Sequence, residues 1–511
     1  MLEKLDEKKQ AAQANFAIDI KAGLVVFLIA LPLSLGISLA SGAPPTAGLI
    51  SAIFGGIIGS FLGGSYVTIN GAAAGLIVVV LNAIQTLGAG DAILGFKRTL
   101  ACLVVVGILQ ILTGIIKAGK FSALFPLSVV HGMLTAIGLI IMIKQSHVFF
   151  GQTVSGSIIS SFLQIPNSIG NLNTQATIIG VLGIALLLLY PRLQFKVSKI
   201  IPAPLIVVVI GIIAASYMSN VALVKIPTNP SEFFLTPTFD VITSFNSILA
   251  IFTIFFVASL ESILSAIAVD KLDPLQRESD FNRELWSKGV VNLCCGLVGG
   301  LPIIAEIVRS SANISQGAKT PLANFSHGIL ILLFVLFLPG TLNTIPLSAL
   351  AAILIMVGYR LAQPKQFIEM WHLGMDSFLA FLTTIILTLA EDLLIGILGG
   401  MIVQTICSFI MGAKFKSLIT PSFAWEENGD KANITFKDSL TYSSILKQKG
   451  IIQKASTFKE IRIDLRDVNY IDVTSIQLFH RETDKIEKSG KKIDVHFNDE
   501  IHSMLNKLKD H

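Results

Sequence analysis

Long apolar runs separated by short polar segments fill the chain from residue 22 to residue 412. A helix of about 20 mostly apolar residues is long enough to cross a bilayer. The pattern therefore predicts fourteen membrane spans, at residues 22–40, 46–64, 71–86, 99–116, 121–143, 175–190, 200–218, 245–268, 286–301, 305–318, 323–339, 346–361, 374–389 and 392–412. It indicates an α-helical polytopic membrane protein, and an even number of spans places both termini on one side.

The pattern changes near residue 426, where polar and apolar positions begin to alternate. Residues 461–465 and 493–497 alternate as half-buried strands. The segment between them predicts a helix that Asp472 or Thr474 would cap. The predicted division is an N-terminal segment, a transmembrane transport domain, a linker and a small α/β domain, at residues 1–21, 22–412, 413–425 and 426–511.

Charge follows the same division of the 511 residues. Residues 22–425 hold 33 charged side chains and residues 426–511 hold 30, and none lies between Lys21 and Asp91. If the N-terminus is cytoplasmic, the predicted inner loops hold fourteen Lys and Arg, Lys288 among them, and the outer loops only four. Because cytoplasmic loops gather Lys and Arg, both termini are predicted to be cytoplasmic.

Several functional classes are excluded by what the sequence lacks. No basic stripe with interleaved aromatics appears, so no nucleic-acid partner is expected. The four cysteines lie in apolar stretches and the eight histidines are scattered, so neither a disulfide framework nor a metal centre is expected. No catalytic constellation is present, and the chain is predicted to be a protein of the lipid bilayer that is not an enzyme and has no cofactor.

Two predicted spans, 71–86 and 305–318, are short and rich in small residues. They are the third and the tenth predicted spans, so each is the third span of a seven-span half. Because each half has an odd number of spans, the second half has the opposite orientation in the membrane. Interrupted spans at matching positions of inverted halves point to a transporter's binding site. The alternative is that both are packing helices whose small residues allow close contact.

Ionisable residues inside a membrane span are costly and are often functional. Glu261, Glu306 and Arg309 lie in predicted spans. Converging amino ends of two half-helices, with Arg309 one turn inside the second, would make an anion site. The candidate substrate-binding residues are Ala73, Ala74, Gly75, Ile307, Val308, Arg309 and Ser310. Arg309 could instead pair with Glu306, three residues away on the same helix face.

Ionised Glu261 and Glu306 cannot be direct ligands of an anion. They fit a coupling role, in which a carboxylate must be protonated or must hold Na⁺ before the anion enters. Ser265, one turn after Glu261, could give a hydroxyl oxygen to such a hard cation. Co-transport of H⁺ or Na⁺ at Glu261, Ser265 and Glu306 is therefore expected, the alternative for Glu261 being a structural hydrogen bond between helices.

Four motifs resemble the sulfate permease (SulP) family of anion transporters, at residues 30–34 (ALPLS), 41–49 (SGAPPTAGL), 282–293 (NRELWSKGVVNL) and 296–302 (GLVGGLP). The resemblance implies fourteen spans as seven-plus-seven inverted repeats, a core domain that moves against a gate domain in an elevator-type movement, and a homodimer in a bacterial inner membrane. It also implies that Arg309 is the pore arginine and Glu261 the coupling carboxylate.

Three departures from the family pattern lie at or near the expected site. The third span begins Asn70-Gly71-Ala72 without the usual proline, Leu33 replaces a common glutamine, and Glu306 is an additional acid. These departures bear on the substrate. The pattern resembles a bacterial subgroup, some members of which are joined to carbonic anhydrase, and this favours bicarbonate as well as sulfate.

The C-terminal domain resembles a STAS domain, the usual cytoplasmic partner of such transporters. Relatives of that domain can carry a phosphorylated serine at the strand-to-helix turn, where Thr474 and Ser475 are nearest in this sequence. Helix capping is the simpler role for these residues.

The prediction is thus a secondary active transporter of a small inorganic anion of the bicarbonate or sulfate class. The first alternative is a nucleobase or organic-anion proton symporter on the same scaffold, which would use Glu261 and Glu306. The others are an uncoupled anion channel and a membrane anchor for STAS-mediated signalling.

Overall fold

The computed structural model describes residues 15–117, 119, 124–153, 157–192, 201–227, 229–391, 393–498 and 501. The chain forms two compact units. The first contains residues 1–119 and 137–361, and the second contains residues 120–136 and 362–511. The division falls within one helix, α6 (Leu127–Phe149).

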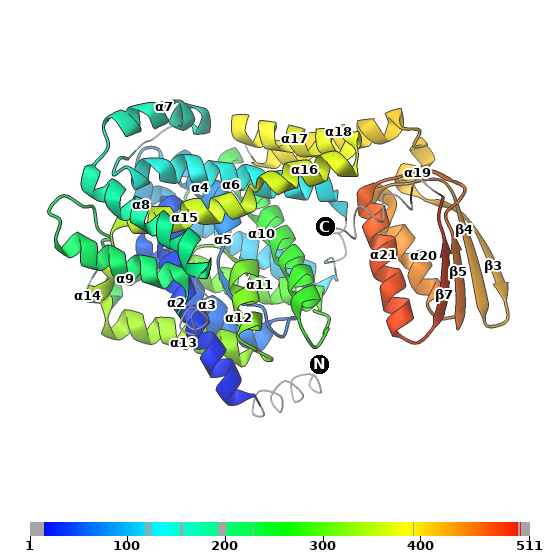
Figure 1. The fold of residues 1–511 in the computed structure, drawn as a ribbon, viewed down its shortest axis with the longest axis horizontal. Helices are drawn as coiled ribbons and strands as arrows, with labels where there is room; N and C mark the ends of the chain where they lie inside the picture. The colour runs from blue at the N-terminus through cyan, green and yellow to red at the C-terminus, as the bar shows by residue number, and fades with distance from the viewer. Residues whose placement is uncertain are drawn as a thin grey trace. The chain divides into compact units, whose positions relative to one another are not determined.

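The described part of the first unit is built almost entirely of helices (Figure 1). Two short strands interrupt them, β1 (Asn70–Ala72) and β2 (Ile303–Ala305). The helices are α2 (Phe16–Ala40), α3 (Pro45–Leu62), α4 (Ile77–Gly88), α5 (Ala92–Ile115), α7 (Ile158–Gly170), α8 (Thr174–Leu189), α9 (Ala203–Ser216), α10 (Phe245–Leu272), α11 (Phe281–Val298), α12 (Ile307–Ser315), α13 (Leu322–Phe337), α14 (Pro339–Leu342) and α15 (Leu347–Leu361). The 3₁₀ turns are η1 (Ala74–Leu76), which leads into α4, η3 (Tyr190–Arg192) and η5 (Pro230–Phe233).

Each of the fourteen predicted spans coincides with one of these helices, with α6, or with α17 and α18 of the second unit. Eight helices among the described residues are long and apolar enough to cross a bilayer, judged by length and composition. The number of spans itself stays a prediction. One predicted boundary shifts, because α2 begins at Phe16 inside the predicted N-terminal segment. Two further helices, α7 and α16 (Pro364–Leu373), lie outside the predicted spans.

Small residues bring helix backbones of the first unit into direct contact. A Cβ added at Gly107 of α5 would lie 2.6 Å from the backbone nitrogen of Leu293 in α11, and one at Gly289 would lie 2.5 Å from that of Ile111. Lipid gives no hydrophobic reason for helices to associate, so such close packing supplies the contact energy.

The second unit contains the C-terminal domain, whose sheet has the strand order β3-β4-β5-β7, with β6 also paired to β4. β4 runs antiparallel to β3 and parallel to β5 and β6, and β7 runs parallel to β5. The elements of this unit after α16 are α17 (Met375–Ala390), α18 (Leu393–Ile410), α19 (Phe415–Ile419), β3 (Ser422–Asn428), β4 (Lys431–Leu440), η6 (Tyr442–Ser444), α20 (Ile445–Ala455), β5 (Glu460–Asp464), β6 (Val468–Ile471), α21 (Val473–Lys488) and β7 (Lys492–His496).

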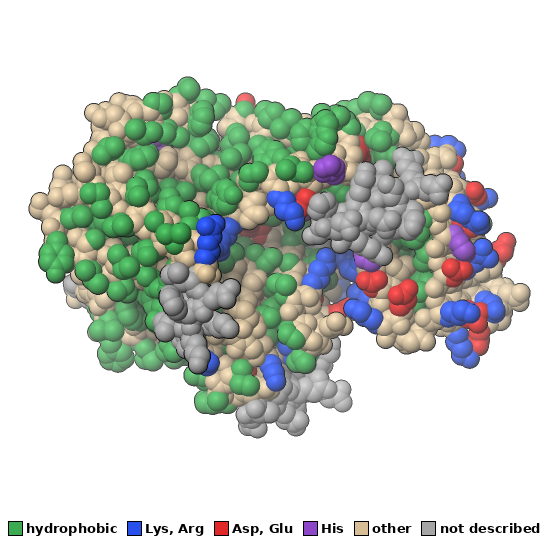
Figure 2. All heavy atoms as spheres, in the orientation of Figure 1, with side chains coloured by type: hydrophobic (Ala, Val, Ile, Leu, Met, Phe, Trp, Pro, Cys, Tyr) green, Lys and Arg blue, Asp and Glu red, His purple; other side chains and the backbone are tan. Residues whose placement is uncertain are grey.

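The two strands and the helix expected in the C-terminal domain are confirmed as β5, β7 and α21. The predicted linker at 413–425 contains α19 and the start of β3. Figure 2 shows hydrophobic side chains over most of the helical surface on the visible face and charged side chains gathered over the C-terminal domain. Exposed Leu163, Tyr217 and Phe245 belong to the apolar surface, which suits contact with lipid tails.

A glycine-to-glycine contact between α13 and α3 gives the first testable prediction. Gly328→Ala in α13 places a methyl group 2.9 Å from the Cα of Gly56 in α3, and a backbone atom cannot turn aside. Overpacking of this kind costs about 1–3 kcal/mol, so the variant should unfold at a lower temperature in a thermal melt of the detergent-solubilised protein. Gly340→Ala is the control, since its Cβ would meet nothing within 4 Å. Equal melting temperatures for both variants would contradict the prediction.

Candidate functional site

The two short strands hold the predicted half-helices together. β1 pairs antiparallel with β2, with Gly71 opposite Ile304. The pairing extends by one backbone bond at each end: Ala73 N–H donates to the Pro302 carbonyl (3.3 Å) and Glu306 N–H donates to that of Ile69 (2.8 Å). Each strand leads directly into a half-helix, β1 into η1 and α4, and β2 into α12.

The predicted start of the first half-helix at residue 71 is wrong. Residues 70–72 are a strand, and helical structure begins at Ala74. Small residues at the start of an apolar run are compatible with either a strand or a helix. Residues 70–72 form a strand because they pair with β2, which begins 233 residues later in the chain.

Side chains satisfy the backbone groups that the interrupted helices leave free. Asn292 is bound twice to Ile303, because its Oδ1 accepts from the backbone N–H (2.7 Å) and its Nδ2 donates to the carbonyl (3.3 Å). Four further bonds do the same work: Ile69 N–H to Ser310 Oγ, Asn70 N–H to Asn324 Oδ1, Ser51 Oγ to the Leu301 carbonyl, and Asn313 Nδ2 to the Val67 carbonyl. Non-helical backbone at membrane depth requires such partners.

Arg309 lies on α12 over β1, and its side chain is fully buried. A Cβ added at Gly71 would lie 2.1 Å from Arg309 Nη1, so the guanidinium rests on the bare glycine backbone. Among the described residues, Nε, Nη1 and Nη2 of Arg309 have no hydrogen-bond partner, Glu306 included. A buried, unpaired guanidinium is costly unless an anion accepts its hydrogen bonds.

Two carboxylates lie at the start of the first half-helix. Glu306 Oε1 accepts a hydrogen bond from Ala74 N–H (3.3 Å). A Cβ added at Gly75 would lie 1.8 Å from Glu261 Oε1, so the Glu261 carboxylate packs against that glycine. Both side chains are buried, and Glu261 Oε2 has no hydrogen-bond partner. Adjacent residues 74 and 75 are therefore each flanked by one acid.

The structure distributes the predicted anion ligands unevenly. Ala74 and Gly75 contact Glu306 and Glu261, and Arg309 lies against Gly71, whereas Ala73 N–H and the Ser310 hydroxyl already serve the backbone. Ile307 is 39% exposed and Val308 is half-buried. Two groups that were predicted to bind the substrate, Ala73 N–H and the Ser310 hydroxyl, thus hydrogen-bond to the backbone around the paired strands instead.

Of the three predicted cation ligands, Glu261 and Ser265 lie one turn apart on α10, whereas Glu306 directly precedes α12. Ser265 is half-buried one turn after Glu261 on α10. Ser262, beside Glu261, is fully buried and its hydroxyl has no partner. Within the described residues, no three His, Cys, Asp or Glu side chains gather as a metal site.

Several buried polar residues were missed by the sequence reasoning. Lys288 was counted as an inner-loop residue, but it lies fully buried in α11 and pairs with Glu284. Glu284 Oε2 also accepts from Gly64 N–H at 2.7 Å, so the pair supports the turn after α3. His327 of α13 is fully buried. The i, i+4 spacing of Glu284 and Lys288 was the available signal.

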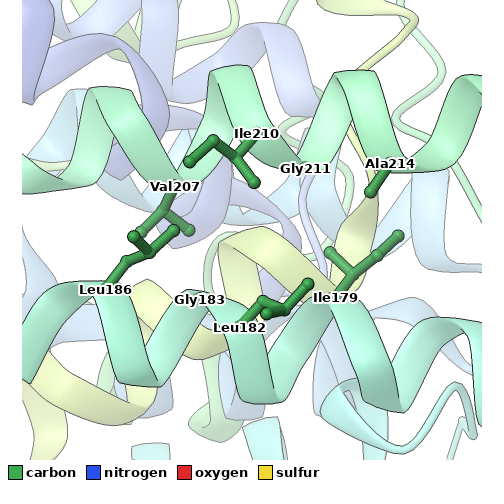
Figure 3. A pocket seen from close by; sticks show the side chains of 8 residues that line it. All are labelled: Ile179, Leu182, Gly183, Leu186, Val207, Ile210, Gly211 and Ala214. Atoms are coloured by element: carbon green, nitrogen blue, oxygen red, sulfur yellow. The ribbon is translucent and has the colours of Figure 1, made fainter.

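An apolar hollow elsewhere in the first unit has no part in this site. It lies between α8 and α9 and has no interior space large enough for a water molecule (Figure 3). Its lining consists of apolar residues and glycines: Ile179, Leu182, Gly183, Leu186, Val207, Ile210, Gly211 and Ala214. Because no polar side chain faces it, it offers nothing to an anion.

The sulfate permease family profile matches residues 16–384, which include both half-helices and all the groups described above. The chain belongs to the sulfate permease family. It is 29% identical over 398 residues to the putative sulfate transporter YvdB of Bacillus subtilis, covering 76% of this chain and 72% of that protein. It is 26% identical over 400 residues to the bicarbonate transporter BicA of Picosynechococcus, covering 77% and 70%.

Solved structures share the fold. The transmembrane domain of a cyanobacterial BicA superposes with a TM-score of 0.68 at 25% identity, over 75% of this chain and 97% of that domain. SLC26A9 superposes with a TM-score of 0.71 at 18% identity, over 98% of this chain and 88% of that protein. As a sulfate permease family member, the protein is a multi-pass membrane transporter of anions, and not an enzyme.

The C-terminal domain of this family member uses its strand-to-helix turn for structure. Asp472 caps α21 by accepting from Ser475 N–H (2.7 Å), and it also accepts from Tyr442 N–H. Burial raises the pKa of Asp472 to about 7. The Thr474 hydroxyl accepts from Leu127 N–H (3.0 Å) at the start of α6, and the Ser475 side chain is fully buried. Asp472, rather than Thr474, is thus the helix cap.

The contact between Gly71 and Arg309 gives a prediction for the site. Gly71→Ala should displace the guanidinium, because a methyl group and Nη1 cannot both occupy the space. A hydrogen bond to a charged group contributes about 1.5–3 kcal/mol, so calorimetric titration with sulfate and bicarbonate should show anion affinity reduced by about tenfold or more. Gly170→Ala, whose Cβ would meet nothing within 4 Å, is the control. If Gly71→Ala binds the anions with wild-type affinity, Arg309 takes no part in anion binding.

Proposed function

We propose that this protein is a secondary active transporter of a small inorganic anion of the bicarbonate or sulfate class. One observation carries the proposal: Arg309 is fully buried against Gly71 of β1, and none of its three nitrogens has a hydrogen-bond partner among the described residues. A small oxyanion offers two neighbouring oxygen acceptors, which match a pair of parallel N–H donors of a guanidinium. The names of the relatives YvdB and BicA support the two candidate substrates.

Glu261 is proposed as the coupling residue. Its carboxylate packs on Gly75 at the amino end of the first half-helix, and its Oε2 is buried without a partner. A carboxylate buried in this way favours a bound proton or a cation, and either would also reduce repulsion toward an incoming anion. Ser265 and Glu306 are the proposed additional oxygen ligands if the cation is Na⁺.

Alternating access by an elevator-type movement is the proposed mechanism. The half-helices are tied to one another by β1–β2 pairing, and Asn292, Asn324 and Ser310 tie the strands to neighbouring helices of the same unit. Rigid connections of this kind favour movement of the site as one body rather than opening of the site itself. A homodimer in a bacterial inner membrane, with both termini cytoplasmic, completes the proposal, and a STAS-like role is proposed for the C-terminal domain.

The second candidate is a nucleobase or organic-anion proton symporter. The observation that favours it is the placement of Glu261 and Glu306 beside residues 74 and 75, where two acids could bind the N–H groups of a neutral ring. Arg309 counts against it, because a neutral substrate leaves the guanidinium uncompensated. An uncoupled channel would leave Glu261 without a role.

A substrate screen tests the proposed function. Purified full-length protein in liposomes should accumulate labelled bicarbonate or sulfate when a proton or sodium gradient is imposed. The gradient should be necessary for accumulation above the outside concentration, because a coupled transporter uses the cation's free energy. Uptake of labelled uracil without inorganic anion flux would establish the second candidate, and flux without accumulation would establish a channel.

Glu261→Gln tests the coupling residue. The amide keeps the shape of the side chain but can neither release a proton nor hold Na⁺ by charge, so accumulation under the cation gradient should be lost, while exchange of anion for anion persists. Liposome uptake with and without the gradient measures both. Glu391→Gln, at an exposed position after α17, is the control. Unchanged gradient dependence in Glu261→Gln would return the residue to a structural role.

A further inference from the structure

Two arginines hold the carboxyl ends of the half-helices, away from the proposed anion site. We propose that Arg98 and Arg277 are positioning residues for anion binding: each ties the carboxyl end of one half-helix to one end of α10, and together they fix the orientation of both half-helices. This inference rests on the proposed anion site and adds the residues that hold its geometry from a distance.

The first clamp joins α4 to the segment that leads into α10. Arg98 Nη1, on α5, donates to the Leu87 carbonyl in the last turn of α4 (2.7 Å). Its Nε donates to both oxygens of Asp240 (3.0 and 3.2 Å), shortly before α10 begins. The last carbonyls of a helix have no partner within the helix and carry partial negative charge. Arg98 therefore both satisfies and compensates the carboxyl end of α4.

The second clamp joins the turn after α12 to the far end of α10. Arg277 Nη1 donates to the Lys319 carbonyl (2.6 Å), and its Nε and Nη2 donate to the Asp273 carboxylate (2.7 and 3.2 Å). The Lys319 N–H donates in the opposite direction, to the buried Asp19 of α2 (2.8 Å). Side chains from two other segments thus hold this one peptide group, and with it the turn that ends the second half-helix.

Arg277 also contacts the chain that leads into β1. Its guanidinium lies over the ring of Tyr66, 4.5 Å from the ring centroid. The chain from Tyr66 to β1 runs beside α12, where Asn313 Nδ2 donates to the Val67 carbonyl (3.0 Å). Arg277 therefore closes a row of contacts that starts at the β1–β2 pairing and ends beyond α12.

The helix α10 connects the two clamps. Asp240 precedes its first residue and Asp273 follows its last. A carboxylate at the carboxyl end of a helix meets the negative end of the helix dipole, so Asp273 is unfavourable there unless a cation such as Arg277 compensates it. The β1–β2 pairing holds the half-helices only near their amino ends. The clamps hold the opposite ends against one helix, so each half-helix is fixed at two points.

Lysine in place of each arginine tests the clamps. Arg98→Lys and Arg277→Lys keep the positive charge but lose the fork of donors that binds an aspartate and a carbonyl together. In full-length protein in liposomes, KM for labelled sulfate and bicarbonate should rise about three- to tenfold in each variant, with little change in Vmax, because a displaced half-helix weakens anion binding. Arg466→Lys is the control, since Arg466 binds Asp464 through a similar fork in the C-terminal domain.

Asparagine in place of each aspartate separates positioning from attraction of the anion by the arginine charge. Asp240→Asn and Asp273→Asn each remove a negative charge beside an arginine, so attraction alone predicts a lower KM for the anion. The clamps predict a higher KM, because the neutral amide holds the arginine less firmly than the carboxylate does. Asp464→Asn is the matched control and should keep the wild-type KM. The sign of the change decides between the two explanations.

The outcomes separate this inference from the function on which it rests. If wild type takes up neither anion, the proposed function fails and the inference fails with it. If wild type transports an anion, three results overturn only the inference: an unchanged KM in the clamp variants, a lower KM in the asparagine variants, or an equal rise in the controls. A rise confined to one clamp overturns the role of the other arginine.

Thermal melts show whether a raised KM comes from misfolding. Asp240 is 44% exposed, and an exposed ion pair adds little to folding stability, so Arg98→Lys and Asp240→Asn should melt like wild type. These two variants keep the test valid if the buried Asp273 makes either change at the second clamp prevent folding. A wild-type KM in both of them would then overturn the inference.

Discussion

The bilayer's inability to hydrogen-bond an unwound backbone is the constraint on which this structure depends. Two helices are interrupted in the first unit, and each interruption frees N–H and C=O groups that must find partners inside the protein. The β1–β2 pairing satisfies part of them, and Asn292, Asn324 and Ser310 satisfy others. Hydrogen bonding to the unwound backbone therefore explains part of the motif that resembles the family's most specific pattern. The geometry of the candidate site depends on these hydrogen bonds.

Two buried cations show how function is separated from structure in this protein. Lys288 and Arg309 are both fully buried. Lys288 has a carboxylate partner, Glu284, which also binds the turn after α3. Among the described residues Arg309 has no hydrogen-bond partner, although Glu306 is three residues away. A buried pair is compensated and stabilises the fold, whereas an unpaired buried guanidinium is costly unless an anion accepts its hydrogen bonds. The same contrast sets Glu306 apart, since it binds an amide of the opposite half-helix rather than a neighbouring cation.

Periodicity and charge were sufficient to predict most of the architecture, because hydrophobic patterning is a local property of each helix. The fourteen runs coincide with helices, and β5, α21 and β7 lie where alternation and capping placed them. Local signals failed at the interruptions. Residues 70–72 carry small side chains that are compatible with strand or helix, and Lys288 looked like a loop residue because its burial depends on α11 packing against other helices.

The sequence by itself determined that the chain is a polytopic helical protein with two interrupted spans, a buried Arg309 and two buried acids, since each of these follows from composition and spacing. Only the tertiary structure decided what those groups contact. Ala73 and Ser310 serve the backbone, while Ala74 meets Glu306, because antiparallel pairing joins segments more than two hundred residues apart. Hydrogen bonds between distant segments are non-local. The pattern of neighbouring residues therefore does not show which backbone donors these bonds use and which they leave unpaired.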